Sequence, residues 1–220
     1  MPANKVSQRE PRQASFASLL DGLLPGLALR GQGPSAAQIG ALEAFARLML
    51  DWNKSLNLTG ARGVEDLVED HLGDPLVAAE EVAQGARVMD VGAGGGLPGL
   101  ALAILRPDLR LVLIEPRAKR VAFLRTATRE LGLKGVEVFG GRVEQFEPSG
   151  RPSVAISRAT FPPELWVPMG KSLVAPDPAS RVFAFLGDRE APDTLPSPLS
   201  TRSYRLPKGQ TRVLLGFGAP

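Results

Sequence analysis

The chain contains no cysteine and a single histidine, His71. The absence of cysteine excludes a disulfide framework, an iron–sulfur cluster and a cysteine nucleophile. One histidine without any cysteine also excludes a Cys/His zinc site, so no metal is expected.

Long hydrophobic runs are also missing. No apolar stretch approaches the roughly 20 residues that a transmembrane helix needs, and the start, MPANKVSQREPRQ, lacks the apolar centre of a signal peptide. We therefore expect a cytoplasmic protein with no membrane partner. We also expect it to be a monomer. Residues 1–13 are polar and are expected to be a disordered tail.

The composition is otherwise that of a globular protein. The 220 residues are 44% hydrophobic and 22% charged, so the chain can bury a core. Its length fits one domain with an appendage. The formal net charge of +3 is compatible with a nucleic-acid partner but does not by itself indicate one.

Residues 14–84 carry apolar side chains at the three- and four-residue spacing of amphipathic helices, and they are expected to form an N-terminal helical cap. The first helix is expected to stop at Pro25-Gly26 and the third before Pro75, because proline disrupts a helix interior. Ser35 is a suitable N-cap for the second helix. Three helices are therefore expected, over about 16–24, 36–52 and 64–72.

From residue 87 the pattern changes to short aliphatic runs separated by helix-length segments, as in parallel βαβ units. Two final runs flank PKGQ (207–210) and predict an antiparallel hairpin. The fold expected for 85–220 is α/β, with a mostly parallel, Rossmann-like, seven-stranded sheet and an antiparallel edge hairpin. The expected strands cover 87–91, 111–115, 136–139, 154–157, 182–186, 203–206 and 211–217, and the expected helices include 117–131 and 163–173.

A glycine-rich turn, DVGAGGGLPG (90–99), follows the first expected strand. It contains a G-x-G-x-x-G pattern, and Glu115 ends the next strand about 20 residues on, as in dinucleotide-binding folds. Glycines admit positive φ and let backbone approach a ligand closely, which equally suits S-adenosylmethionine (SAM). A lone pattern of this kind does not separate the two ligands.

Asp90 favours SAM over a dinucleotide. A dinucleotide would bring a pyrophosphate to this turn, where the Asp90 carboxylate repels it and no basic residue of the loop offsets the repulsion. SAM brings an ammonium and a sulfonium, which a carboxylate attracts. Glu115 can accept hydrogen bonds from ribose hydroxyls of either ligand. We therefore assign cofactor binding to Asp90, Gly92, Gly94, Gly96 and Glu115.

Six separated motifs occupy residues 36–186: WNKSLNLT (52–59), HLGD (71–74), the glycine turn (90–99), KRVAFL (119–124), GRVE (141–144) and ISRA (156–159). In order and spacing they resemble the bacterial small-subunit (16S) rRNA guanine-N7 methyltransferases, also called glucose-inhibited division protein B. The resemblance implies a class I SAM-dependent methyltransferase fold and a SAM-binding methyltransferase domain over 85–220. It also implies methyl transfer to N7 of a guanine in small-subunit ribosomal RNA, free or in a ribosomal particle.

The resemblance further implies which residues touch SAM, namely Gly92, Leu97, Val143, Glu144 and Arg158. Arg158 follows the fourth expected strand, where a side chain faces the ligand crevice, and we expect it to be catalytic. A guanidinium there suits a carboxylate, a phosphate or a guanine edge.

Other candidate residues have ordinary structural interpretations. His71 and Asp74, three residues apart, are expected to be a hydrogen-bonded pair on one helix face. Phe45 and Trp52 are expected to belong to the core of the cap. The family has Lys before the residue matching Gly187 and Ser after the residue matching Asp74, whereas this chain has Leu186 and Pro75.

Residues 117–134 contain six basic residues against the single acid Glu130 and are the RNA-binding candidate. The residues assigned to RNA are Arg117, Lys119, Arg120 and Arg125.

Three other functions stay open. The first is a SAM-dependent methyltransferase for a small molecule, and the second is a catalytically weak RNA-binding relative, suggested by Leu186. The third, more distant, is a dinucleotide oxidoreductase.

Overall fold

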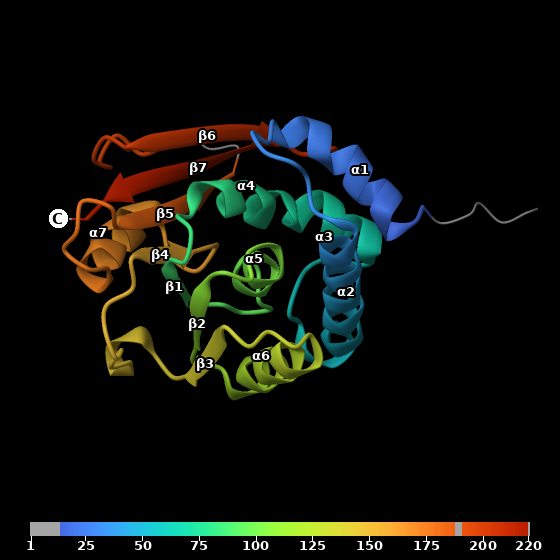
Figure 1. Cartoon of the computed structure of the whole chain (residues 1–220), viewed down its shortest axis with the longest axis horizontal. Coiled ribbons are helices and arrows are strands. Elements are labelled where there is room, and N and C mark those ends of the chain that lie inside the picture. The colour runs from blue at the N-terminus through green and yellow to red at the C-terminus, as the bar shows by residue number, and fades with distance from the viewer. Residues whose placement is uncertain (1–13, 188–190, 220) are drawn as a thin grey trace, which may run out of the picture.

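The computed structural model describes residues 14–187 and 191–219 (Figure 1). The tail predicted for 1–13 lies outside the described residues. The helices are α1 (Phe16–Leu27), α2 (Ala36–Leu56), α3 (Val64–His71), α4 (Gly73–Glu81), α5 (Gly99–Leu105), α6 (Ala118–Glu130), the short 3-10 helix η1 (Val143–Gln145) and α7 (Pro163–Leu173). The strands are β1 (Arg87–Val91), β2 (Arg110–Glu115), β3 (Val136–Gly140), β4 (Val154–Ser157), β5 (Arg181–Leu186), β6 (Ser200–Arg205) and β7 (Thr211–Gly218).

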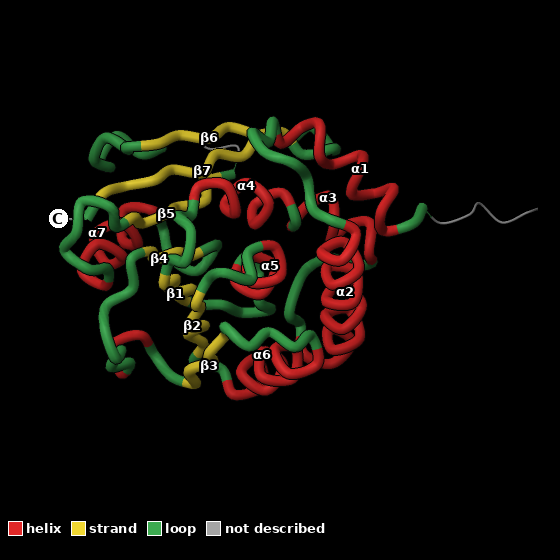
Figure 2. The backbone as a smooth tube through the Cα atoms, viewed as in Figure 1, coloured by secondary structure: helices red, strands yellow, loops and turns green. Residues whose placement is uncertain are grey.

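The strands form one sheet of the predicted kind. Its order is β3-β2-β1-β4-β5-β7-β6, in which β1 to β5 run parallel and β7 lies antiparallel to both β5 and β6. Figure 2 shows the strands crossing the middle of the molecule with helices on both sides. The strand order reverses between β1 and β4, the place where open α/β sheets bind ligands at the carboxyl ends of their strands.

The first predicted helix end is wrong. Pro25 lies inside α1, which continues to Leu27 and ends where Ala28 takes a left-handed conformation (φ 47°). Leu23 and Leu27 are both fully buried, and this burial outweighs the one helical hydrogen bond that a proline cannot donate. The predicted N-cap is confirmed, because Ser35 accepts from the backbone N–H of Gln38, whose side chain in turn accepts from Ser35 N–H.

The third helix ends before Pro75, as predicted, but a fourth helix that was not predicted, α4, begins directly after it. Leu72 ends α3 and also precedes α4, and Pro75 is the third residue of α4. The N–H groups of a helix's first turn have no partner within the helix, so proline costs little there. The chain therefore turns between His71 and Asp74 instead of continuing as one helix.

Two apolar layers hold the sheet. On one side α5 and α6 cover the parallel strands, and a large core joins them to the N-terminal helices through buried side chains such as Phe16, Phe45 and Phe123. On the other side α7 packs Trp166 against β4 and β5, and its indole donates to Phe183 O at 2.8 Å. The division into a cap and a sheet domain at 84/85 stays a prediction. Within the described ranges, no helix is long and apolar enough to span a membrane.

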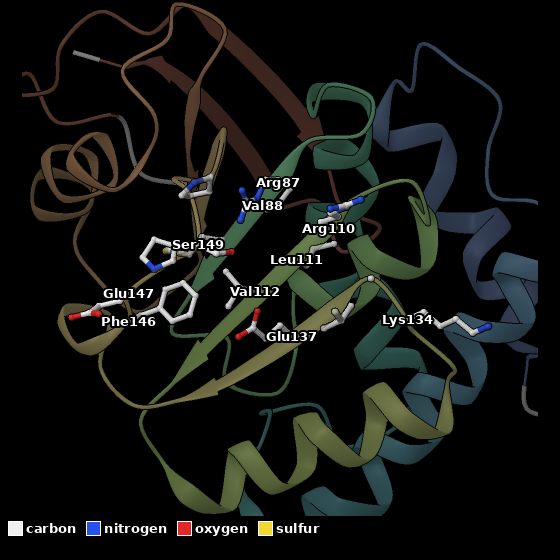
Figure 3. A pocket seen from close by; sticks show the side chains of 15 residues that line it. Arg87, Val88, Arg110, Leu111, Val112, Lys134, Glu137, Phe146, Glu147 and Ser149 are labelled. Carbon is white, nitrogen blue, oxygen red and sulfur yellow. The ribbon is translucent and has the colours of Figure 1, made fainter.

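Val143 of η1 and Phe146 after it pack on the side of β1 and β2 that faces away from α5 and α6. A cleft of about 610 Å³ lies there, over the amino ends of these strands. Figure 3 shows the side chains that line it, among them Arg87, Arg110 and Phe146. The cleft is thus at the opposite end of the strands from the glycine turn.

Candidate functional site

The glycine turn connects β1 to α5 in a conformation that requires glycine. Gly92, Gly94 and Gly96 have φ values of 78°, 56° and 83°, in the left-handed region. Thr160 packs so closely on Gly92 that a Cβ there would lie 2.4 Å from its hydroxyl oxygen. The prediction that these glycines admit positive φ is confirmed. The turn therefore presents bare backbone to the space in front of it.

That space is a hollow of about 240 Å³ at the carboxyl ends of β1 and β4. The glycine turn, the segment before α3, the end of α3 and the segment after β4 all contribute to it. Its lining includes Thr59, His71, Gly92, Gly94, Leu97, Arg120 and Arg158. The structure thus brings together Gly92, Gly94, Leu97 and Arg158 from the predicted site, and adds Thr59 and Arg120.

Asp90 lies beneath the turn and is 1% exposed. Its Oδ2 accepts from the Gly99 N–H at 3.0 Å, at the start of α5, while its Oδ1 is buried without a hydrogen-bond partner. Burial raises the pKa of this carboxyl to about 7, although the Gly99 N–H and Arg158 favour the charged form. Asp90 therefore lies behind the turn, outside the lining of the hollow.

Glu115, at the end of β2, holds the same turn from the side and is 2% exposed. One carboxylate oxygen accepts from Gly94 N–H and the other from Arg117 N–H, both at 2.9 Å. Each oxygen has a second lone pair, so the carboxylate can still accept from a ligand. Glu115 thus has a structural task that its position at the strand end did not reveal.

Arg158 follows β4, as predicted, and its side chain is 15% exposed. Its Nη1 donates to Asp74 Oδ2 at 2.7 Å, and its Nη2 lies 3.2 Å from His71 Nδ1. Because a guanidinium can only donate, His71 Nδ1 must be an acceptor and the ring must be neutral. The His71 Nε2–H then donates to the Thr59 hydroxyl at 3.2 Å.

The predicted pairing of His71 with Asp74 on one helix face is wrong. The two residues belong to different helices, α3 and α4, and each is a partner of Arg158. Burial, and next the charge of Arg158, lower the pKa of His71 to about 4, which agrees with a neutral ring. The turn between α3 and α4 is what aims both side chains at the arginine.

Two residues of the final hairpin complete this cluster. The Tyr204 hydroxyl donates to Asp74 Oδ1 in a short hydrogen bond, and Arg212 Nη1 lies 3.7 Å from Asp74 Oδ2. Burial and the negative charge of Asp74 raise the pKa of Tyr204. Sequence reasoning missed both residues, since they are separated from Asp74 by 130 positions or more and carry no motif of their own.

The remaining predicted cofactor residues lie outside the lining of the hollow. Gly96 is buried and packs on Leu100, whereas its neighbour Gly95 faces the hollow. Val143 and Glu144 lie on η1 after β3, where Val143 is buried and Glu144 is exposed. Their contact with a cofactor stays a prediction.

The side chains of the basic residues in 117–134 point in different directions. Arg117, Lys119 and Arg125 are exposed, and Arg125 Nη2 donates to Val138 O at 3.4 Å. Arg120 is half-buried, lines the hollow and reaches toward Gly94. Arg120 is thus placed to touch a ligand in the hollow, while the other three face solvent.

The backbone and carboxylate groups of the site fit SAM. The positive-φ glycines Gly92 and Gly94 leave bare backbone at the hollow, Asp90 Oδ1 is a buried acceptor without a partner, and Glu115 keeps lone pairs at a strand end. Carboxylates in these two positions suit an ammonium and ribose hydroxyls.

Comparison with known proteins shows the family to which this chain is related. Residues 38–193 match the family described as rRNA small subunit methyltransferase G. Ribosomal RNA small subunit methyltransferase G of Halorhodospira halophila is 38% identical over 186 residues, covering 82% of this chain and 87% of the relative. The protein of the same name from Anaeromyxobacter dehalogenans is 36% identical over 182 residues, covering 80% and 84%.

Solved structures confirm the predicted fold. An RNA methyltransferase from Salinibacter ruber, in complex with S-adenosyl-L-homocysteine, superposes with a TM-score of 0.51 at 19% identity, covering 68% of this chain and 91% of that one. A SAM-dependent methyltransferase from Aquifex aeolicus gives 0.50 at 18% identity, covering 69% and 93%. The sheet is therefore that of the class I SAM-dependent methyltransferases. With its motifs and the match over 38–193, the chain belongs to the rRNA small subunit methyltransferase G family.

Proposed function

We propose that this protein transfers a methyl group from SAM to N7 of a guanine in small-subunit ribosomal RNA. The observation that carries the proposal is the hollow in which a positive-φ glycine turn meets Arg158, in a chain of this methyltransferase family. The bound SAM would supply an electrophilic methyl group on a sulfonium. Asp90, Gly92, Gly94, Leu97 and Glu115 would hold it.

The residues of the hollow suit an acceptor that needs no general base. Guanine N7 has a free lone pair at neutral pH, so catalysis requires alignment and an environment that tolerates a cationic purine. His71 is the one histidine of the chain, and its Nδ1 is engaged by Arg158. This ring is therefore occupied in holding Arg158 and does not act as a base.

Arg158 is the residue to which we assign direct contact with the reacting groups. Its guanidinium lines the hollow while Asp74 and His71 hold it from behind. Holding a side chain in one geometry removes the entropy cost of ordering it during the reaction. Asp74, His71 and Tyr204 then act as positioning residues.

Exposed cations beside the hollow provide the RNA contacts of this proposal. Arg117 directly follows β2, and Lys119 and Arg125 lie on α6. Phosphate contacts of this kind orient RNA without reading its sequence.

Since ribosomal RNA is made and assembled in the bacterial cytoplasm, we place the protein there. We also propose that it acts as a monomer.

Methyl transfer from SAM labelled in its methyl group tests the function. We expect the wild-type protein to label small-subunit particles or naked small-subunit RNA, and a Gly92→Ala variant to lose the activity because its Cβ would collide with Thr160. Gly22→Ala is the matched control, since open space surrounds Gly22. Absence of label in both substrates with wild-type protein would contradict the proposal.

A further inference from the structure

A second hollow adjoins the one at the glycine turn. It measures about 460 Å³, within the range of about 300–1,000 Å³ usual for ligand pockets. Ala159 and Thr160 line both hollows, so the two share a wall. Whatever occupies the second hollow lies next to whatever occupies the first.

The segment after β4 builds this shared wall. Ala159 takes a left-handed conformation (φ 55°), which is costly for a residue other than glycine and is typical of functional sites. The Thr160 hydroxyl lies 3.3 Å from Gly92 O and 3.2 Å from Arg158 O. The bend at Ala159 therefore sends Arg158 into the first hollow and the residues after Thr160 into the second.

The second hollow is lined mostly by apolar residues, with one acidic residue. Its lining includes Phe161, Pro163, Phe185 and Leu186 together with Glu164. The ring of Phe161 is stacked on Trp166, with 6.2 Å between centroids and 10° between planes, so it is supported from behind. Phe161 is half-buried, which leaves part of its ring available to a ligand. Aromatic faces of this kind stack nucleic-acid bases.

We infer that the second hollow receives the target guanine after it has left the RNA stack, with its ring against Phe161 and its N1–H and 2-amino groups donating to the Glu164 carboxylate. The inference rests on the proposed function and adds the site of the base and the residue that selects guanine. A base in an A-form helix presents N7 to a deep, narrow groove, so an enzyme reaches it only in an extruded or unpaired base.

The placement is consistent with the chemistry of the transfer. N1 and the 2-amino group lie across the purine from N7, so a base held at Glu164 can direct N7 toward the shared wall. The N7 lone pair forms the new bond to the methyl carbon, and the electron pair of the breaking carbon–sulfur bond stays on sulfur. No proton moves, and the purine gains one positive charge. The Glu164 carboxylate would stabilise that charge, and Leu186 adds no opposing cation.

Glu164 also has a structural interpretation. It lies in the first turn of α7, where a carboxylate interacts favourably with the helix dipole. That interaction stabilises the fold but does not distinguish one base from another. Selectivity between guanine and a base that lacks the 2-amino group therefore separates the two roles.

The test compares substrate RNA that carries guanine or inosine at the modified position, since inosine lacks the 2-amino group. Losing one hydrogen bond to a charged group costs on the order of 10-fold or more, so we expect the wild-type protein to prefer guanine by at least that factor in kcat/KM. In Glu164→Gln, activity on guanine should fall and the preference should shrink toward one. Phe161→Leu should weaken both substrates about equally, because stacking is tolerant of base identity.

Binding provides a readout that does not depend on turnover. Calorimetry with 7-methylguanosine 5′-monophosphate should show weaker binding to Glu164→Gln and Phe161→Leu than to wild type. Glu137→Gln is the matched control, because Glu137 is an exposed carboxylate on β3, in the cleft at the other end of the strands. This control should behave as wild type in both experiments.

The outcomes separate this inference from the function on which it rests. Wild-type transfer to guanine N7, with an unchanged guanine preference and unchanged nucleotide binding in Glu164→Gln, would overturn the inference alone. Wild-type transfer to another position or base would overturn the proposed function as well. If Glu164→Gln lowers only the melting temperature, Glu164 interacts with the helix dipole and has no role in selecting guanine.

Discussion

Arg158 Nη1 lies 2.7 Å from Asp74 Oδ2, and this ion pair joins the end of β4 to the start of α4. Asp74 is 1% exposed and also accepts from the Tyr204 hydroxyl, so the final hairpin contributes to the same cluster. Buried charges are stable only when paired and hydrogen-bonded. The C-terminal strands therefore help to position a residue of the candidate site.

Tyr204→Phe tests this link. The change removes the hydroxyl that donates to Asp74 and leaves Oδ1 without that donor, so the free energy of unfolding should fall by about 1–3 kcal/mol. We also expect a lower kcat with little change in KM for RNA, measured well below the melting temperature, because Arg158 is less firmly held. Ser203→Ala on the same strand is the control. A Tyr204→Phe variant that loses stability but keeps its kcat would restrict Tyr204 to a structural role.

His71 should titrate near pH 4, well below an ordinary histidine. Its pKa is lowered by burial and by Arg158. Between about pH 6.5 and 4 the unfolded chain takes up a proton that native His71 refuses, so stability decreases as pH falls through that window. Because His71 is the one histidine, its ring signals in an NMR titration report it directly. A midpoint near 6.5 would contradict the buried contact with Arg158.

We expect Asp90→Asn to weaken SAM binding and to stabilise the fold relative to wild type at high pH. The raised pKa of Asp90 means that the native state binds a proton more tightly than the unfolded chain, so ionising this group costs stability increasingly as pH rises from about 4 to 7. The melting temperature of the variant, relative to wild type, should therefore be more favourable at pH 8 than at pH 5. Calorimetry should show weaker SAM binding by the variant. Equal SAM affinity would remove Asp90 from the cofactor site.

Glu115→Gln should weaken SAM binding more than Glu144→Gln. Glu115 supports Gly94 and is expected to accept ribose hydroxyls, each charge-assisted bond contributing about 1.5–3 kcal/mol. Glu144 is exposed on η1. Dissociation constants in the opposite order would show that the end of β2 does not bind the ribose.

The exposed cations near the hollow should determine the salt dependence of RNA binding. Replacing Arg117 and Lys119 with Gln should weaken binding to all sequences and flatten the log–log salt slope by roughly one per lost contact. Arg87→Gln with Arg110→Gln, in the cleft at the amino ends of the strands, is the matched control. An unchanged slope in the first pair, with a loss in the second, would move the RNA surface to that cleft.

The sheet and the glycine turn could be predicted because their signals are local. Short aliphatic runs indicated the strands, and DVGAGGGLPG indicated a turn where glycine is required. The helix end at Leu27 and the helix α4 could not, because tertiary burial carries α1 past Pro25 and the first turn of α4 accommodates Pro75. Proline alone does not distinguish a helix interior from a first turn.

The side-chain geometry of the site was only partly predictable. The spacing of His71 and Asp74 predicted a pair on one helix face, whereas the turn between α3 and α4 directs both side chains to Arg158. Arg120 belongs to a basic run, yet it lies in the first turn of α6 and lines the hollow near Gly94. The direction of a side chain depends on packing between distant segments, which one sequence does not encode in any local pattern.

The most direct test of the account is the identity of the methylated nucleoside. Small-subunit RNA is incubated with the protein and with SAM carrying a deuterated methyl group, digested to nucleosides and analysed by mass spectrometry. The account predicts that the deuterated methyl group appears in 7-methylguanosine with wild-type protein and is strongly reduced with Arg158→Ala. Label in any other nucleoside, or none in the RNA at all, would contradict it.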